Sequence, residues 1–274
     1  TTPRSNRRQR QMCIRDRYIV WLDGRSRILI DAGGGTFLRF GEADARFEDL
    51  EFVGLSHFHT DHSADFPALL KSGNFSGRER PLTVAGPDAG GPFPGLETYL
   101  ASMLKPGSGA YGYLSGYLDG SGGLARIVAS TVSDAEDPVS VFGDEGGAVS
   151  IDAMHVPHGI VPAIAFRVRV AGKSLVFASD QNGSDTSFID FAKGADVLVM
   201  HMPIPEGATG GALQLHAKPS RLGDIAGAAN VDTLILSHFM ARSLRNLDAN
   251  VADVKRGFAG KTLLASDLAC FALQ

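Results

Sequence analysis

Short apolar runs separated by turn residues recur along most of the chain, which is the pattern of a strand-rich α/β protein. Two strands are predicted at residues 18–22 and 27–31, with an Asp-Gly turn between them, and a short helix is expected around residues 37–40. The apolar run at 52–55 predicts a strand that leads directly into a polar cluster. Further strands are predicted at residues 81–85, 125–131, 139–142, 148–154, 163–170, 174–178, 196–200, 233–236 and 261–265.

Helices are predicted near residues 63–71 and 220–229, where they would cover the sheets from outside. The Asp-Gly and Ala-Gly turns imply antiparallel strand pairs. This order of elements fits an α/β fold, an αββα sandwich of two mixed β-sheets flanked by helices. The 274 residues, 44% of them hydrophobic, are enough for one domain with a full core, and we assign that domain to residues 18–274.

Residues 1–17 break the pattern. They show no apolar periodicity and carry six arginines against one acidic residue, Asp16. We expect an atypical segment, disordered or foreign to the domain, rather than a nucleic-acid-binding tail. No run of the chain has the length and apolarity of a membrane span, and no signal peptide is visible, so the location is left open between the cytoplasm and a bacterial periplasm.

Three histidines and an aspartate follow the predicted strand at 52–55 within six positions: His57, His59, Asp61 and His62. Imidazole and carboxylate together suit zinc and related divalent ions, and such a dense cluster would be costly to bury without a cation. In an extended segment, side chains two residues apart point the same way, so His57 and His59 can hold one ion. A helix that begins near Asp61 would turn Asp61 and His62 toward a second ion. The cluster therefore predicts a metal site with room for two ions.

The spacing His-x-His-x-Asp-His resembles the signature of the metallo-β-lactamase superfamily. The later run His158-Gly159-Ile160 is similar to the ribonuclease Z and arylsulfatase-like branch of that superfamily, in which a ligand histidine directly precedes a glycine and a strand. The resemblance implies further ligands at strand ends, and His158, Asp180 and His238 supply them in order. His155 is the alternative to His158 as the third histidine ligand.

The resemblance also implies two ions, whose ligands form two sets joined by a bridging carboxylate: His57, His59 and His158; Asp61, His62 and His238; and Asp180 as the bridge. The ions are expected to be Zn²⁺, with Mn²⁺ or Fe as alternatives. A metal-bridging hydroxide would attack the substrate, so the predicted activity is metal-dependent hydrolysis.

Two further histidines stand at predicted element ends. His216 resembles the proton donor that ribonuclease Z relatives place near the metals, so Asp61 and His216 are the candidate catalytic residues. His201 stands where those relatives commonly read His-Glu, but the glutamate position is Met202 in this chain. This departure weakens the interpretation that His201 belongs to a ribonuclease-type proton relay. The other interpretation is that His201 has a structural role.

Two features point away from an RNA substrate. Only 22 positions separate His158 from Asp180, which leaves no room for the long RNA-gripping arm that tRNA-processing ribonuclease Z enzymes usually carry. Residues 18–274 hold 20 basic and 29 acidic residues, a net charge of −9, whereas binding of a phosphate backbone needs a basic surface. Nucleic acid and membrane are therefore not expected as partners, and a homodimer is left open.

We therefore expect a small ester substrate: a sulfate ester, phosphodiester, lactone or carboxylic ester, with arylsulfatase-like activity favoured. The alternatives are a ribonuclease Z-like RNA phosphodiesterase and a non-hydrolytic metal-binding or redox protein on the same fold.

A region rich in glycine and proline at about residues 86–123 predicts a helical or loop flap over the domain. It carries five aromatic residues, Phe93, Tyr99, Tyr111, Tyr113 and Tyr117. Aromatic groups beside a metal cleft would suit an apolar or aromatic leaving group, so the flap is expected to select the substrate. The other interpretation is that these aromatic residues only pack the flap onto the sandwich.

Overall fold

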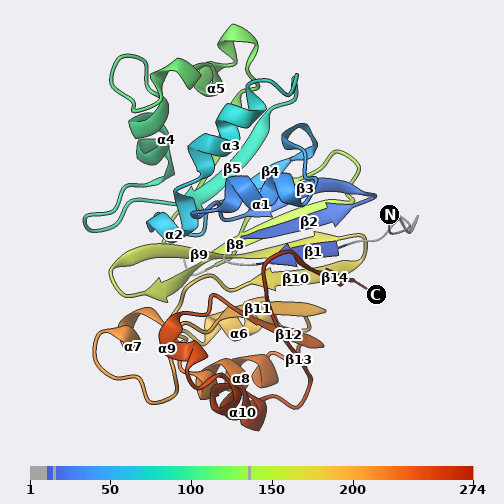
Figure 1. Ribbon diagram of the computed structural model, residues 1–274, viewed down its shortest axis with the longest axis vertical. Helices are drawn as coiled ribbons and strands as arrows, with labels where there is room; N and C mark the ends of the chain where they lie inside the picture. The colour runs from blue at the N-terminus through green and yellow to red at the C-terminus, as the bar shows by residue number, and fades with distance from the viewer. Residues whose placement is uncertain (1–10, 15–16, 135–136, 274) are drawn as a thin grey trace.

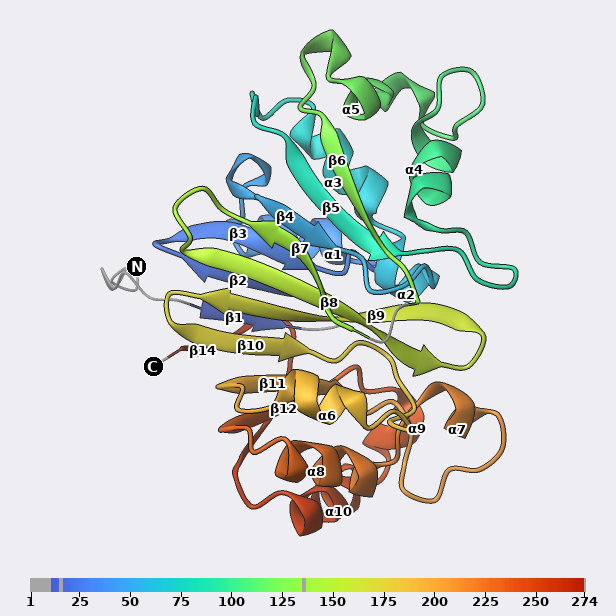
Figure 2. The same ribbon diagram turned by 180° about the vertical axis from the view of Figure 1, so that it is seen from behind.

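The structure is a computed structural model that describes residues 11–14, 17–134 and 137–273. Two seven-stranded mixed sheets lie against each other, with helices on the outside of each, as Figures 1 and 2 show from opposite sides. The expected αββα sandwich is therefore confirmed. Four residues of the N-terminal segment form a strand, and its first ten residues lie outside the described part of the chain.

The first sheet has the strand order β14-β1-β2-β3-β4-β5-β6. Its strands are β1 (Gln11–Ile14), β2 (Tyr18–Leu22), β3 (Arg25–Ile30), β4 (Phe52–Gly54), β5 (Leu82–Pro87), β6 (Ile127–Val132) and β14 (Ala269–Ala272). Strands β3 to β6 run parallel to one another, so their carboxyl ends meet at one edge of the sheet.

The second sheet has the order β13-β12-β11-β10-β9-β8-β7. Its strands are β7 (Val139–Gly143), β8 (Val149–His158), β9 (Val161–Val170), β10 (Lys173–Phe177), β11 (Val197–His201), β12 (Thr233–Ser237) and β13 (Lys261–Leu264). Strands β10 to β13 are parallel, while β8 and β9 form a long antiparallel hairpin. The ends of β8, β10 and β12 are the points from which this sheet supplies site residues.

The helices divide between the two outer faces. The first sheet carries α1 (Thr36–Glu42), η1 (Phe47–Asp49), α2 (Thr60–Ser63), α3 (Phe66–Gly73), α4 (Leu96–Leu104), η2 (Gly112–Leu114), α5 (Gly116–Asp119) and η3 (Ser121–Gly123). The second carries α6 (Ser187–Ala192), α7 (Ala212–Leu215), α8 (Pro219–Ala228), α9 (Ala241–Leu244) and α10 (Leu247–Gly257).

Buried apolar side chains form three layers that match this architecture. Phe52, Phe166 and Phe177 belong to the cluster between the two sheets. The other two clusters lie between each sheet and its helices. Burial of apolar surface in these layers fixes the position of one sheet relative to the other. The strand ends that carry the site therefore face one another across the sandwich.

Helices α8 and α10 pack closely enough to require glycine. A Cβ atom on Gly223 would lie 2.1 Å from the carbonyl oxygen of Val254, and one on Gly227 would lie 2.3 Å from that of Gly257. These glycines therefore let the two helix backbones approach each other on the outer face of the second sheet.

The described part of the chain contains no helix that is long and apolar enough to cross a bilayer.

Candidate metal centre

The predicted metal ligands come together at the edge where the parallel strands of both sheets end. His57 and His59 lie in the loop after β4, while Asp61 and His62 belong to α2. The second sheet contributes the last residue of β8 and residues just after β10 and β12: His158, Asp180 and His238. Ligands that lie far apart in the sequence therefore meet because both sheets present their carboxyl ends to one site.

Three imidazoles form the first ligand set. His59 Nδ1 lies 3.1 Å from His57 Nε2 and 3.5 Å from His158 Nε2, and ligand atoms of all three residues lie within 4.8 Å of one another. Two ligands that are each about 2.1 Å from one ion at a tetrahedral angle lie roughly 3.4 Å apart. The spacing of these nitrogens fits a shared ion.

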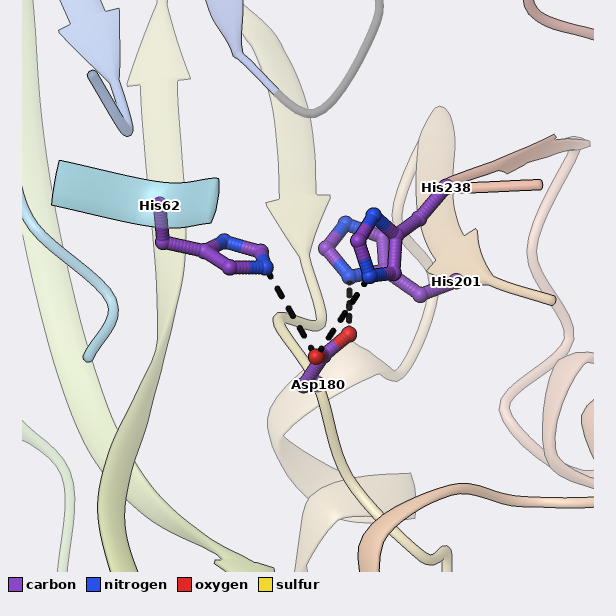
Figure 3. Close-up of side chains that lie close together, drawn as sticks. All are labelled: His62, Asp180, His201 and His238. Carbon is purple, nitrogen blue, oxygen red and sulfur yellow. Dashed lines mark hydrogen bonds and ion pairs between the residues drawn. The ribbon is translucent and has the colours of Figure 1, made fainter. Parts of the chain in front are cut away.

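A second group contains His62, Asp180, His201 and His238, again with ligand atoms within 4.8 Å of one another. In Figure 3, Asp180 lies between His62 on one side and His201 and His238 on the other. Asp61 Oδ2 lies 3.9 Å from His62 Nε2 and 3.8 Å from His238 Nε2, so it can complete the second set.

A single oxygen of Asp180 stands between the two sets. Its Oδ2 atom lies 3.9 Å from His57 Nε2 and 3.8 Å from His158 Nε2, and 3.6 Å from the Nε2 atoms of His62 and His238. These separations are too long for hydrogen bonds but suit atoms that share ions. The Nε2 atom of His62 is also buried without a hydrogen-bond partner among the described residues. The geometry therefore fits two divalent cations with Asp180 between them.

Hydrogen bonds on the far side of the imidazoles orient them. His62 Nδ1 donates to Asp31 Oδ2 at 2.8 Å, and Asp31 also accepts from the amide and hydroxyl of Ser56. His57 Nδ1 lies 3.1 Å from Ser56 Oγ, and His158 Nδ1 donates to the carbonyl of Leu215 at 2.7 Å. Because Nδ1 is used in these contacts, Nε2 faces the centre in each ring.

Asp31 was not among the residues that the sequence singled out. It follows β3 in the left-handed backbone region, with φ of 62°, and is buried. A single aspartate after a strand is ordinarily a turn residue, so the only available signal was its place at the end of an apolar run.

The other oxygen of Asp180 leads into a buried hydrogen-bond chain. His201 Nδ1 donates to Asp180 Oδ1 at 2.7 Å, and His201 Nε2 lies 2.7 Å from the hydroxyl of Tyr18. The same hydroxyl lies 2.7 Å from Ser237 Oγ. Since a neutral imidazole with a protonated Nδ1 accepts at Nε2, Tyr18 donates to His201. His201 therefore orients the Asp180 carboxylate, in agreement with its structural interpretation, and Tyr18 extends this support across the sandwich.

Burial keeps several of the imidazoles neutral. It lowers the pKa of His57 well below its ordinary value and also lowers the pKa of His158 and of His201. Neutral imidazole is the form that binds a metal ion.

The pKa values of Asp180 and His62 are shifted by each other and by neighbouring charged groups. Burial raises the pKa of Asp180, but His238, His201 and His62 outweigh it and hold that pKa well below its ordinary value. Burial lowers the pKa of His62, but the Asp31 and Asp180 carboxylates outweigh it and hold that pKa well above its ordinary value. Asp180 is thus ionised and ready to accept a cation.

His216 lies beside this centre, and His155 lies away from it. His216 is buried after α7, with Nδ1 3.8 Å from Asp180 Oδ1, and burial lowers its pKa to about 4. His155 is three residues before His158 on β8, so it points to the opposite face, where Nδ1 pairs with Asp134 at 3.3 Å. Between the two histidines, only His158 faces the centre.

Comparison with known proteins agrees with this geometry. The sequence profile of the Beta-lactamase superfamily domain matches residues 26–239. The chain belongs to this superfamily. It is therefore a metallo-hydrolase of the metallo-β-lactamase fold, as its sequence resemblance predicted, and its histidine and aspartate cluster is compatible with a divalent metal centre.

Several relatives found by sequence are named Ribonuclease Z. Ribonuclease Z of Listeria monocytogenes is 25% identical over 94% of this chain and 90% of its own length. Ribonuclease Z of Thermobifida fusca is 28% identical over 92% of this chain and 86% of its own length. Human tRNase Z, short form, shares the fold with a TM-score of 0.70 at 17% identity, over 95% of this chain and 93% of its own.

The expectation that nucleic acid is not a partner is contradicted by these relatives and was wrong. Net charge describes the whole surface, whereas a scissile phosphate meets the local field of the site, in which bound cations are the largest charges. The absence of a long arm between His158 and Asp180 removes one way of holding RNA without affecting the groups that would hydrolyse it.

Proposed function

We propose that the chain is a two-metal phosphodiesterase that hydrolyses RNA, with residues 18–274 as one hydrolase domain. The position of Asp180 Oδ2 between two sets of imidazoles carries this proposal, because it suits a pair of ions that share one carboxylate. The ribonuclease names of the relatives support RNA as the substrate class. Neither observation favours an aryl sulfate, which the sequence alone had suggested.

The proposed ligands are the seven residues predicted from the sequence: His57, His59, Asp61, His62, His158, Asp180 and His238. Two cations held there would supply positive charge for the phosphate oxygens and would lower the pKa of a water molecule toward neutrality. The protein contributes fixed orientation, through the hydrogen bonds of Asp31, Ser56 and Leu215 to the imidazoles.

His216 is the proposed proton donor to the leaving oxygen. Its Nδ1 atom is buried without a hydrogen-bond partner among the described residues, and it lies within 4 Å of the bridging carboxylate. A pKa of about 4 leaves His216 neutral at pH 7, but a phosphate brought against the ring would raise that pKa toward the range in which a general acid works.

The proposal is tested on protein stripped with a chelator and reloaded with Zn²⁺ or Mn²⁺. Cleavage of an end-labelled RNA oligonucleotide and a transfer RNA would be compared with turnover of bis(p-nitrophenyl) phosphate, p-nitrophenyl sulfate and a lactone. We expect cleavage of RNA and of the aryl diester, dependent on metal. Turnover of the sulfate or the lactone without any phosphodiester cleavage would refute the proposal.

Two substitutions separate the roles of the site residues. Asp180→Asn should lower the metal content below two ions per chain and reduce turnover by at least about a hundredfold. His216→Ala should keep both ions and lose roughly a hundredfold in turnover. His155→Ala is the matched control, and we expect wild-type metal content and activity from it. Loss of metal in His155→Ala would reverse the choice between His155 and His158.

A further inference from the structure

Among the described residues, two of the seven proposed ligands are reached by solvent and the other five are buried. His57, His62, His158, Asp180 and His238 are buried. His59 is half-buried, and the Asp61 side chain is 47% exposed. A substrate must therefore approach the centre from the side of His59 and Asp61.

Phe93 stands against His59 on this open side. The two ring centroids lie 5.8 Å apart at an interplanar angle of 70°, and Phe93 itself is half-buried. Phe93 therefore contacts one of the two proposed ligands that solvent reaches, and part of its own side chain is also exposed.

The loop that carries Phe93 is held in place. Gly90 and Phe93 exchange two backbone hydrogen bonds, of 3.2 and 3.0 Å. A Cβ atom on Gly90 would lie 2.6 Å from Cγ of Pro162, so the loop packs directly on the β8–β9 hairpin that supplies His158. This fixed loop gives Phe93 the rigid placement that a binding platform needs.

The other aromatic residues of the flap have different contacts. Tyr99 stacks on Phe58 at 4.4 Å and donates to the carbonyl of Ser63, so it anchors the flap to the ligand loop. Tyr117 is buried and donates to the carbonyl of Leu70. These two therefore fit the packing interpretation of the flap aromatic residues.

Two flap tyrosines are exposed instead. Tyr113 is 65% exposed and lies 5.5 Å from the ammonium of Lys71, and Tyr111 is also exposed. Among the flap aromatic residues, only Phe93 has a described ring contact with a proposed ligand.

Two exposed apolar residues follow the ligands of the second sheet. Ile160, two residues after His158, is 73% exposed, and Met240, two residues after His238, is 38% exposed. Together with Phe93 they place apolar side chains on three separate segments, two of them within two residues of a proposed ligand in the sequence and Phe93 in ring contact with one. Apolar and aromatic surface of this kind recognises a flat ring rather than a phosphate group.

We propose that Phe93 is a stacking platform for the nucleobase that flanks the scissile phosphate. This inference rests on the proposed function, since it assumes that the substrate is RNA. Stacking on aromatic side chains is tolerant of base identity, so Phe93 would strengthen RNA binding without imposing a strict sequence preference.

The test measures binding of a fluorescent, cleavage-resistant 2′-O-methyl RNA hexamer and the KM for a cleavable RNA, using metal-loaded protein. Phe93→Ala should weaken the Kd and raise the KM about tenfold. It should leave the content of metal ions unchanged. Phe93→Trp should retain or strengthen binding, because it preserves the ring. Tyr113→Ala is the matched control, an exposed aromatic residue of the same flap, and should bind RNA as the wild type does.

A hexamer that lacks bases should bind wild type and Phe93→Ala equally weakly, since no ring is left to stack. Wild-type Kd and KM in Phe93→Ala would overturn the platform and leave the proposed function standing. An equal loss in Tyr113→Ala and Phe93→Ala would also overturn the platform. Absence of RNA cleavage by the wild type, with turnover of the aryl diester, would instead overturn the proposed function and the platform with it.

Discussion

Ser179 lies in the left-handed backbone region immediately before the proposed bridging carboxylate, with φ of 59°. Glycine adopts positive φ without steric conflict, whereas the Cβ atom of a serine makes this backbone conformation unfavourable. The hydroxyl of Ser179 is also buried without a hydrogen-bond partner among the described residues. Asp31 and His238, at the same edge, share positive φ angles.

Ser179→Gly should therefore raise the free energy of unfolding by about 1 kcal/mol, because it relieves the backbone strain and removes an unsatisfied hydroxyl. Chemical denaturation would measure this change in the free energy of unfolding, and the dependence of that free energy on denaturant concentration should stay the same. Asp44→Gly is the control, since Asp44 is exposed, has φ of 56° and lies away from the ligands. A loss of stability in Ser179→Gly would show that the serine contributes a contact that outweighs the strain.

Tyr18 supports the proposed bridging carboxylate of Asp180 through His201, so we treat its hydroxyl as a positioning group. Tyr18→Phe should weaken metal affinity by roughly ten- to a hundredfold, the usual effect of losing such outer contacts. Competition with a chromophoric chelator would measure the affinity. The control is Tyr117→Phe, which also deletes a buried hydroxyl bond but lies in the flap. It should lower stability by about 1 kcal/mol and leave metal affinity unchanged.

The residues of the site differ in how readily a sequence discloses them. His57 to His62 combine metal-binding residue types at close spacing, so the sequence alone predicts a metal site there. Asp31 and Tyr18 act through tertiary contacts with His62 and His201, and nothing near them in sequence marks that role. The sequence named Phe93 among five flap aromatic residues expected beside the metal cleft, but which of the five lies against His59 depends on how the flap folds back.

At the scale of elements, strands were predicted better than helices. Buried parallel strands such as β11 and β12 are continuous apolar runs with clear ends. Helix α10 has few buried residues and a mostly polar sequence. Its pattern of apolar positions therefore did not predict a helix. The helix predicted to begin near Asp61 and to cover residues 63–71 is two helices, α2 and α3, so α2 directs Asp61 and His62 separately from the packing of α3.

The contact between α8 and α10 gives a prediction at this scale. Gly223→Ala should destabilise the protein by about 1–3 kcal/mol, because the added methyl group would meet the Val254 carbonyl and push the helices apart. Gly41→Ala in α1 is the control. It should stabilise the protein by about 0.5–1 kcal/mol, since no atom lies within 4 Å of the new methyl group. Thermal unfolding would compare them, and equal shifts in Tm would contradict the close packing.

For the whole molecule, pH should act strongly once the metal is removed. His216, with a pKa lowered by burial to about 4, binds a proton in the unfolded chain more readily than in the folded one. Its contribution to stability is complete above pH 6.5 and is lost as pH falls toward 4. His57, His158 and His201 have lowered pKa values and act in the same direction.

His62 acts in the opposite sense, because its raised pKa gives stability that is present at low pH and lost as pH rises through that value. Below pH 6.5 the contribution of His62 no longer changes with pH, so the four groups with lowered pKa values set the trend and we expect chelator-treated protein to lose stability between pH 6.5 and 4. Chemical denaturation at several pH values across this range would measure the loss of stability. His216→Ala should make the free energy of unfolding depend less steeply on pH. A chelator-treated protein that becomes more stable toward pH 4 would contradict the assignment.

The pairing of β1 with β14 joins residues from opposite ends of the described chain, with Gln11 opposite Ala272. His238, the last of the proposed ligands along the chain, is synthesised before residues 269–272, so all the proposed ligands exist while the outer edge of β1 still lacks its partner strand. An open strand edge is a template for wrong pairing. A cation captured at that moment would stabilise the two half-sandwiches against each other, so the supply of metal during translation would influence how much of the newly made protein escapes aggregation.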